Sequence, residues 1–384
     1  MRRWGSTQRW LRGLAISIGV AAAVPEEGPS KRQKVIIVAD VGVDDAAGLL
    51  WALANEKLEV LGVTASFGCH WDVRRTAANA RTVLRSAGRE DVPVFVGSRW
   101  AFGQSASPRL DGSLFHGPDG FGGEGGPWSE EEPESLPTCP SAGGSCAATK
   151  LSAAEFLVQS ARALPGEVVF LSFSSLTDVA LAALLEPNLP WLIKSLVVMG
   201  GALYSAGNVS PLAEANFARD AAATQAVFQA FGGREAFARD GPRPAPVVLA
   251  PLDVTLQALV TPGDLLQAGA SGGASAKLWA KAAGHYRKSY CEIAGICGGI
   301  PLHDAHTVAF LLEPGLYTNI SELSIEVIVT AEEGRTEHGM SVVDRRAQAG
   351  RGGLGERQSR VQALLGVDGE RYVRSFLEHL ALLP

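Results

Sequence analysis

The fold of this chain is decided by the stretch Lys34-Val-Ile-Ile-Val-Ala-Asp40-Val-Gly-Val-Asp-Asp45. Its first half is a continuous apolar run, which predicts a strand buried on both faces, as in a parallel sheet. Gly42 permits a tight turn after this strand, and the carboxylates of Asp44 and Asp45 favour the start of a helix over residues 44–55. The stretch therefore predicts the first strand, turn and helix of an α/β protein.

The same alternation of apolar strand and helical stretch recurs along the chain. Short apolar runs predict further strands at residues 58–67, 92–96, 168–173, 196–199 and 247–252. Helical patterns are expected at residues 74–87, 176–185 and, as the last helix, 368–383. Residues 31–384 are therefore expected to form a single α/β domain, with a mostly parallel, Rossmann-like open sheet and helices on both of its faces.

Composition restricts the classes of function. With 384 residues, of which 46% are hydrophobic, the chain can bury one large core. Its formal net charge of -6 lacks the basic field that nucleic-acid binders use, so no DNA or RNA partner is expected. No segment after the first thirty residues is long and apolar enough to span a membrane. A compact soluble enzyme fits these properties.

The first thirty residues differ from the rest. Arginines precede an apolar run at residues 14–24, and no acidic residue occurs before Glu26. The run is shorter than the roughly 20 residues that a spanning helix needs, and Ala21 to Ala23 offer small residues suited to a cleavage site. Residues 1–30 are interpreted as a secretory signal or an organellar transit peptide. The alternative is a disordered, arginine-rich tail on a cytoplasmic protein.

Two further features stand outside the α/β pattern. Residues 122–148 are dense in small and polar residues that cannot bury enough apolar surface to offset chain entropy, so we expect a solvated surface insertion there. The five cysteines do not have the spacing of a zinc site. We expect free thiols, accompanied at most by a Cys139–Cys146 bridge inside the insertion.

Carboxylates gather at the carboxyl end of the first predicted strand, where open α/β sheets bind ligands. Asp40, Asp44 and Asp45 would repel one another in an apolar crevice unless a cation joined them. Oxygen ligands favour a hard ion such as Ca²⁺ or Mg²⁺. The alternative is that Asp44 and Asp45 only cap the helix that begins there.

Residues 38–46, Val-Ala-Asp-Val-Gly-Val-Asp-Asp-Ala, resemble the amino-terminal motif of nucleoside hydrolases, Asp-x-Asp-Pro-Gly-x-Asp-Asp-Ala. Later segments are similar to the family in the same order along the chain: His116-Gly-Pro-Asp-Gly120, Val197-Val-Met-Gly-Gly201, Gly207-Asn208, Ala213-Glu-Ala-Asn216, Pro251-Leu-Asp-Val-Thr255 and Pro301-Leu-His-Asp304. The resemblance implies a Ca²⁺-dependent α/β enzyme, dimeric or tetrameric, that cleaves the bond between a ribose and its nucleobase.

The resemblance also implies a role for individual residues. Asp40 matches the position that ligates calcium and acts as general base toward water. The other implied calcium ligands are Asp45, Asp304 and the main-chain carbonyl of Phe173. The family's groups that bind the ribose hydroxyls match Asp44, Asn208, Glu214 and Asn216. Met199 matches a residue that lines the sugar pocket. An anionic pocket stabilises the positive charge that develops on ribose in the transition state.

Substrate choice follows from a second group of residues. His303, directly before Asp304, resembles the family's leaving-group acid. Tyr286 and Tyr290, four residues apart on a predicted helix, are similar to the aromatic pair that closes over the base in inosine-uridine-type members. With His116 they favour that branch over the purine-specific branch, whose pocket stacks the base between tryptophans. Uridine is the expected substrate, followed by inosine; ordinary helix packing is the alternative explanation of the tyrosines.

Several residues depart from the family pattern. Val38 replaces the first aspartate of the motif, Val41 replaces its proline, and Cys69 stands where a ribose-contacting asparagine is usual. Losing the asparagine amide removes a hydrogen bond of about 1 kcal/mol, and losing the aspartate that supports the ligands costs roughly ten- to a hundredfold in metal affinity or activity. We expect a slower enzyme or an altered substrate choice. Asp178, where asparagine is usual, is a milder departure.

Two other classes of function remain open from the sequence. A non-catalytic nucleoside or ribose binder would explain the departures, although such a protein does not need Asp40 as a base and His303 as an acid. A metal-dependent phosphohydrolase would also use paired aspartates after a strand, but no phosphate-binding glycine-rich loop or basic cluster accompanies them.

Overall fold

The computed structural model describes residues 32–102, 111–126, 151–233, 242–331, 335–348 and 359–384. The leader at residues 1–30 lies outside this set, as does most of the insertion at 122–148, including Cys139 and Cys146. None of the described helices has both the length and the apolar character that a bilayer crossing requires.

A nine-stranded sheet forms the centre of the domain, in the order β10-β9-β11-β6-β5-β4-β1-β2-β3. Its strands are β1 Gln33–Ala39, β2 Leu58–Ala65, β3 Val94–Val96, β4 Val168–Ser172, β5 Ser195–Met199, β6 Val247–Ala250, β9 Tyr317–Val327, β10 Ser341–Val343 and β11 Ser359–Val367. The pairings from β3 to β11 are parallel, whereas β9 and β10 pair antiparallel at one edge. The predicted, mostly parallel sheet is confirmed, and the antiparallel edge is an addition to it.

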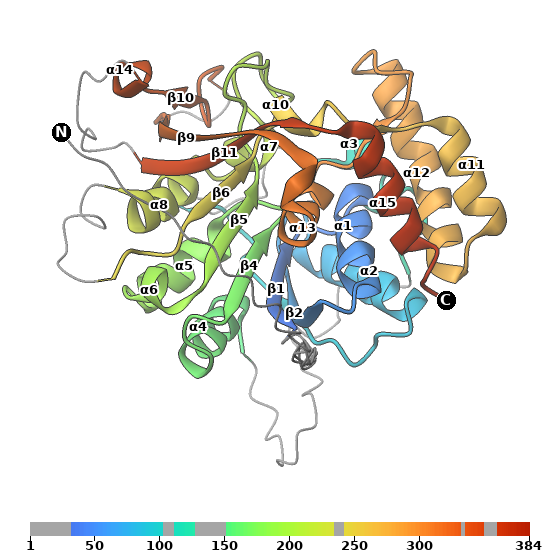
Figure 1. Ribbon diagram of the computed structural model, residues 1–384, viewed down its shortest axis with the longest axis horizontal. Coiled ribbons are helices and arrows are strands. Elements are labelled where there is room, and N and C mark those ends of the chain that lie inside the picture. The colour runs from blue at the N-terminus through green and yellow to red at the C-terminus, as the bar shows by residue number, and fades with distance from the viewer. Residues whose placement is uncertain (1–31, 103–110, 127–150, 234–241, 332–334, 349–358) are drawn as a thin grey trace, which may run out of the picture. The chain divides into compact units, whose positions relative to one another are not determined.

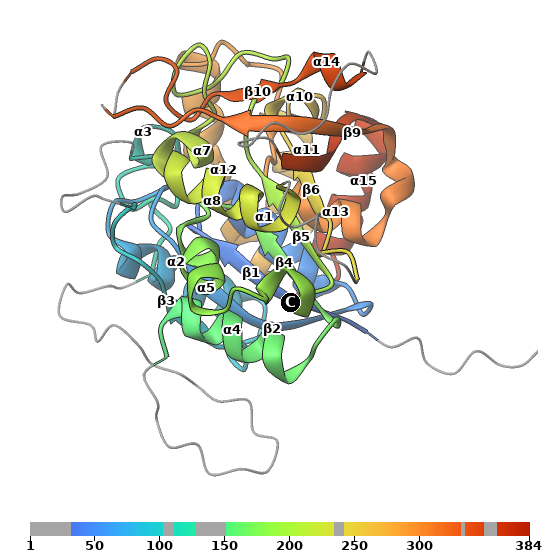
Figure 2. The ribbon, with the colours of Figure 1, turned by 90° about the vertical axis from the view of Figure 1, so that its left-hand side faces the viewer.

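Helices cover both faces of the sheet, as predicted (Figures 1 and 2). One face is covered by α4 Ala153–Ala163, α5 Thr177–Leu185, α6 Leu189–Leu192 and α8 Ala221–Gly232. The other is covered by α1 Val43–Ala54, α2 Val73–Ser86, α12 Ala274–Glu292, α13 Ala305–Leu312 and α15 Gly369–Leu380. The remaining elements are α3 Ser113–His116, α7 Ala215–Arg219, α10 Leu252–Thr255, α11 Pro262–Ser271, η1 Pro314–Leu316, α14 Arg345–Gln348 and a small antiparallel pair, β7 Leu259–Val260 with β8 Ile300–Pro301.

Strand β1 is buried on both faces. Val35 and Ile37 belong to the hydrophobic layer under α1, whereas Ile36 and Val38 belong to the layer under α5. This division follows from the alternation of side chains along a strand. The valine at position 38, in place of the motif's aspartate, is therefore a core residue with no exposed surface.

The turn after β1 places carboxylates at the start of α1. The Asp45 side chain accepts hydrogen bonds from the backbone nitrogen of Gly42 at 2.9 Å and from that of Asp40 at 3.2 Å. These bonds satisfy N–H groups at the helix start and fix the Asp45 carboxylate beside Asp40. Asp45, the third residue of α1, thus completes a capping box with Gly42, and its hydrogen bond with the Asp40 nitrogen brings the two carboxylates together.

The order of the strands reverses at β1, which pairs with β2 on one side and with β4 on the other. At such a point the loops after neighbouring strands diverge and leave a crevice in which open α/β proteins bind ligands. Asp40 follows β1, Phe173 follows β4, and Met199 ends β5. The topology alone therefore brings three predicted site residues to one crevice.

One cysteine prediction is wrong: Cys291 and Cys297 form a disulfide instead of remaining free. Helix α12 ends at Glu292, and the chain turns back through Gly295, whose φ of 71° suits glycine. The turn brings the two cysteine Cα atoms to 4.2 Å. Among the described cysteines, Cys69 is a buried free thiol, as expected.

Candidate active site

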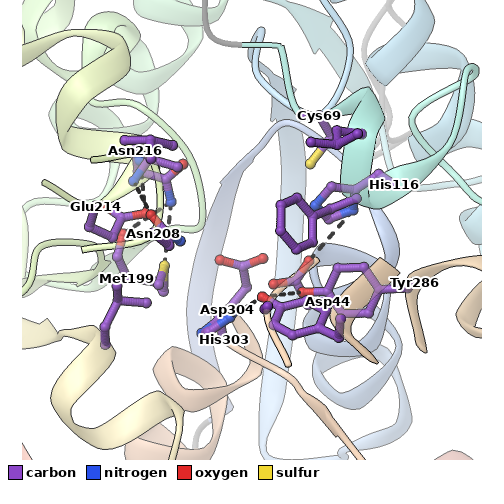
Figure 3. A pocket seen from close by; sticks show the side chains of 18 of the residues that line it. Asp44, Cys69, His116, Met199, Asn208, Glu214, Asn216, Tyr286, His303 and Asp304 are labelled. Atoms are coloured by element: carbon purple, nitrogen blue, oxygen red, sulfur yellow. Dashed lines mark hydrogen bonds and ion pairs between the residues drawn. The ribbon is translucent and has the colours of Figure 1, made fainter. Parts of the chain in front are cut away.

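A cavity of about 610 Å³ opens at the carboxyl ends of the strands. Cavities of this size hold small organic ligands. Every residue predicted to act in the site lines it: Asp40, Asp44, Asp45, His116, Phe173, Met199, Asn208, Glu214, Asn216, Tyr286, Tyr290, His303 and Asp304. Figure 3 shows two opposing groups of side chains, with Met199, Asn208, Glu214 and Asn216 on one side and Asp44, His116 and Tyr286 on the other.

Four buried carboxylates form one wall of the cavity: those of Asp40, Asp44, Asp45 and Asp304. Three carboxylate oxygens, one from each of Asp44, Asp45 and Asp304, all lie within 4.8 Å of one another. Burial, and then the neighbouring carboxylates, raise the pKa of Asp45 and Asp304 well above the usual range and that of Asp44 to about 6. Like charges in so small a volume repel, so ionisation of the whole group requires a cation.

The residues present fit a hard divalent cation. The Oδ1 atom of Asp44 is buried and has no hydrogen-bond partner among the described residues, as expected of an oxygen that awaits a ligand. Asp40 and Asp45 form a second close group with the Cys69 thiol. Burial, and then the charge of Asp40, raise the thiol pKa well above its usual range, which disfavours the thiolate form that binds metals. The carboxylate oxygens are therefore the better candidate ligands for a hard cation.

Asp40 is held from two directions. Its Oδ2 atom accepts a hydrogen bond from the Cys69 backbone nitrogen at 2.6 Å and from Nη1 of Arg219 at 3.2 Å. Burial raises the Asp40 pKa, and Arg219 opposes this rise. Arg219, the last residue of α7, was not among the predicted site residues, because a single arginine at a helix end is usually a solvated side chain.

The ribose-binding candidates on the opposite side are anchored to the backbone. The Glu214 carboxylate caps α7 by accepting from the nitrogens of Asn216 at 2.8 Å and Phe217 at 3.2 Å, and it also accepts from Gly201 at 2.9 Å. The Asn208 side chain accepts from the nitrogen of Ala215 at 2.9 Å. These bonds position both groups before a ligand binds.

A chain of hydroxyl and imidazole groups borders the cavity. His303 lies between Thr255 and Tyr290, with Nδ1 at 2.6 Å from the Thr255 hydroxyl and Nε2 at 2.6 Å from the Tyr290 hydroxyl. The Tyr286 hydroxyl donates to that of Tyr290 at 3.4 Å. Burial lowers the pKa of His303 to about 3, so its ring is neutral at physiological pH. Thr255, which positions His303, was not predicted.

The ring of His116 covers the adjoining wall. Its Nδ1 atom accepts a hydrogen bond from the Val43 nitrogen at 3.2 Å, so the neutral ring carries its proton on Nε2. Burial, and then the charge of Arg219, lower the His116 pKa to about 3. The ring packs against Tyr286 with centroids 4.9 Å apart. His116 and Tyr286 thus form an aromatic surface that remains uncharged at physiological pH.

A third unpredicted residue, Asp253, shapes the loop that leads to Asn208. Its carboxylate accepts from the backbone nitrogens of Leu203, Tyr204 and Ser205, at 2.8, 2.8 and 3.0 Å. The motif Pro251-Leu-Asp-Val-Thr255 therefore contributes two residues that position the site: Asp253 accepts hydrogen bonds from this loop, and Thr255 is hydrogen-bonded to His303. The motif was found from the sequence, but these contacts depend on tertiary packing.

Comparison with known proteins agrees with this geometry. The family described as inosine-uridine preferring nucleoside hydrolase matches residues 35–374. Uridine nucleosidase 1 of Arabidopsis thaliana is 32% identical over 288 residues, covering 75% of this chain and 76% of that protein. The pyrimidine-specific ribonucleoside hydrolase RihA of Klebsiella pneumoniae is 30% identical over 348 residues, covering 90% and 98%.

Solved structures extend the likeness to three dimensions. A plant nucleoside hydrolase, the PpNRh1 enzyme, superimposes with a TM-score of 0.73 at 26% identity, covering 92% of this chain and 99% of that chain. The purine-preferring ribonucleoside hydrolase of Gardnerella vaginalis gives 0.72 at 26% identity, covering 91% and 98%. The chain belongs to the nucleoside hydrolase family and is a nucleoside N-ribohydrolase.

Proposed function

We propose that this enzyme hydrolyses the N-glycosidic bond of uridine, and next of inosine, to ribose and free base in a calcium-dependent reaction. The observation that supports this most is the joint arrangement of one cavity: a buried carboxylate wall, anchored groups for ribose hydroxyls opposite, and a Tyr290–His303 pair beside them. A phosphohydrolase or a passive binder would not require all three.

Asp40, Asp45, Asp304 and the Phe173 carbonyl would hold the cation. When bound, Ca²⁺ supplies Lewis-acid chemistry that lowers the pKa of a water molecule. Asp40 accepts the proton of the attacking water, while the Cys69 nitrogen and Arg219 keep its carboxylate in place through Oδ2. Positive charge develops on ribose as the base departs, and the surrounding carboxylates stabilise it.

The departing base receives a proton through Tyr290. With its proton on Nε2, the neutral His303 ring donates to the Tyr290 oxygen and so stabilises the phenolate that forms when Tyr290 protonates the base; water returns that proton to Tyr290 after the base has left. Tyr286 donates to the same oxygen and steadies its charge. No tryptophan occurs among the described residues that line the cavity, which favours the uridine and inosine branch over tryptophan stacking of purines.

Free ribose released from uridine, inosine, cytidine, adenosine and guanosine tests this proposal, with full-length wild-type protein beside Asp40→Asn. We expect release from uridine first and inosine second, and a loss of roughly a thousandfold or more in Asp40→Asn. Folded protein that binds nucleosides without releasing ribose would instead be a binder. Phosphate release from p-nitrophenyl phosphate without ribose release would indicate a phosphohydrolase.

A further inference from the structure

Arg219 brings a permanent positive charge into the acidic cavity. Its side chain is only 7% exposed, and its Nη1 atom lies 3.2 Å from Oδ2 of Asp40 and 3.0 Å from Oδ1 of Asn216. The guanidinium thus joins a group proposed to hold the cation to a group proposed to bind ribose. A buried arginine is costly unless its charge is paired, and here Asp40 is its partner.

The fold leaves room for this guanidinium. A Cβ atom at Gly68 would lie 2.8 Å from Nη1 of Arg219 and 2.1 Å from Oδ2 of Asp40. A Cβ atom at Gly112 would lie 3.0 Å from Nη2 of Arg219. Glycine at position 68 therefore leaves the space that the Arg219–Asp40 pair occupies, and glycine at position 112 leaves space for both the Cys69 backbone and the guanidinium.

Cys69 adds a second observation on the same carboxylate. Its backbone nitrogen donates to the Asp40 oxygen that Arg219 also contacts, but its thiol lies 3.7 Å from Asp45 and provides only a weak donor. The side chain at position 69 therefore supplies no strong donor to this group of carboxylates, whereas the Arg219 guanidinium supplies one to Asp40.

Arg219 also sets the orientation of an amide. Because Oδ1 of Asn216 accepts from Arg219, Nδ2 must face the other way, where it donates to the Phe173 carbonyl at 2.8 Å. That carbonyl is one of the proposed cation ligands. Arg219 is thus linked to the proposed cation site through Asp40 directly and through Asn216 indirectly.

We propose that Arg219 is a positioning residue that compensates for Cys69 by holding Asp40 and Asn216, at the expense of cation affinity. The expected effect of Arg219 on kcat rests on the proposed function. The positive charge of Arg219 lies beside the cation that Asp40, Asp45 and Asp304 would bind. At short range inside a protein such repulsion is strong enough to lower divalent-cation affinity by about tenfold or more.

The test compares full-length wild type, Arg219→Met, Arg219→Lys, Cys69→Asn and the Arg219→Met/Cys69→Asn double variant. Calorimetric titration with Ca²⁺ gives cation affinity, and ribose release from uridine gives kcat and KM. Arg219→Met should bind Ca²⁺ about tenfold more tightly, because the repelling charge is gone, yet lose roughly tenfold or more in kcat. Arg219→Lys keeps the charge and should keep wild-type Ca²⁺ affinity.

The double variant tests whether Arg219 compensates for the weak donor at Cys69. Cys69→Asn should raise kcat in the Arg219→Met background but not in the wild-type background, where the guanidinium already occupies that role. Equal effects of Cys69→Asn in both backgrounds would overturn the compensation. Unchanged Ca²⁺ affinity in Arg219→Met would overturn the charge effect.

Two controls separate the role of Arg219 from general effects on folding and from the proposed function: a variant outside the cavity, and the Ca²⁺ titration itself. Arg162→Met removes an arginine that pairs with Glu186 outside the cavity, and should leave both readouts unchanged. A wild type that binds Ca²⁺ but releases no ribose refutes the proposed function, while the titrations still decide the role of Arg219. If neither wild type nor folded Arg219→Met binds Ca²⁺, the inference is wrong.

Discussion

The Tyr290 hydroxyl lies 2.6 Å from Nε2 of His303, inside a cavity wall from which water is largely excluded. Because of this contact, His303 acts on the departing base through Tyr290. In the proposed mechanism the Tyr290 hydroxyl lies between the imidazole and the base. The pair therefore makes protonation of the base separable from attack on the sugar.

Removing this pair should affect only substrates whose base needs a proton. In His303→Ala and Tyr290→Phe, kcat on uridine should fall about a hundred- to ten-thousandfold. Activity on p-nitrophenyl ribofuranoside, whose leaving group departs as an anion, should change little. Steady-state kinetics on both substrates checks this. An equal loss on both would mean that these residues act on the sugar or on folding.

Asp253 should matter for substrate binding more than for chemistry. Asp253→Ala leaves three backbone N–H groups of residues 203–205 without their acceptor and loosens the loop that presents Asn208. We expect KM for uridine to rise about tenfold and the free energy of unfolding to fall by about 1–3 kcal/mol. Asp264→Ala is the matched control, because Asp264 caps α11 outside the cavity. A KM that rises equally in both variants would contradict the prediction.

Asp178 should make folding stability depend on pH. It is buried, its Oδ1 accepts from the Ser98 nitrogen at 2.9 Å, and its Oδ2 has no hydrogen-bond partner among the described residues. Burial raises its pKa to about 7. The folded state therefore retains a proton that the unfolded chain releases near pH 4, so this residue's contribution to stability falls by roughly 1.4 kcal/mol per unit as pH rises from about 4 to 7.

Asp178→Asn removes that titration. The variant should gain in Tm relative to wild type at pH 8 more than at pH 5, as measured by thermal unfolding at both values. Asp91→Asn, a change at an exposed carboxylate, serves as the control and should show no comparable difference. A Tm difference between Asp178→Asn and wild type that is the same at both pH values would show that Asp178 is not protonated in the folded protein.

Much of the fold could be predicted from local pattern. The run Val35 to Ala39 is apolar at every position, which is typical of a strand buried on both faces. Strands β9 and β11 escaped prediction because they lie at or near the sheet edge. There, exposed polar residues such as Asn319 and Arg360 interrupt the apolar pattern.

The candidate site was predictable where residues follow strands or belong to motifs. Asp40 and Asp45 are only five positions apart, and the hydrogen bonds of Asp45 with the backbone nitrogens of Asp40 and Gly42 bring them together. Arg219 and Asp253 could not be found in this way. Their roles depend on partners 179 and about 50 positions away, and only tertiary packing brings these together.

The most direct test of the account is ribose release from uridine by full-length protein stripped of divalent cations, then returned to Ca²⁺, beside Asp304→Asn. The account predicts loss of activity on stripping, recovery with Ca²⁺, and a roughly ten- to hundredfold higher Ca²⁺ requirement in Asp304→Asn, because that variant loses a charged ligand. Ribose release that survives stripping, or an unchanged Ca²⁺ requirement in Asp304→Asn, would contradict it.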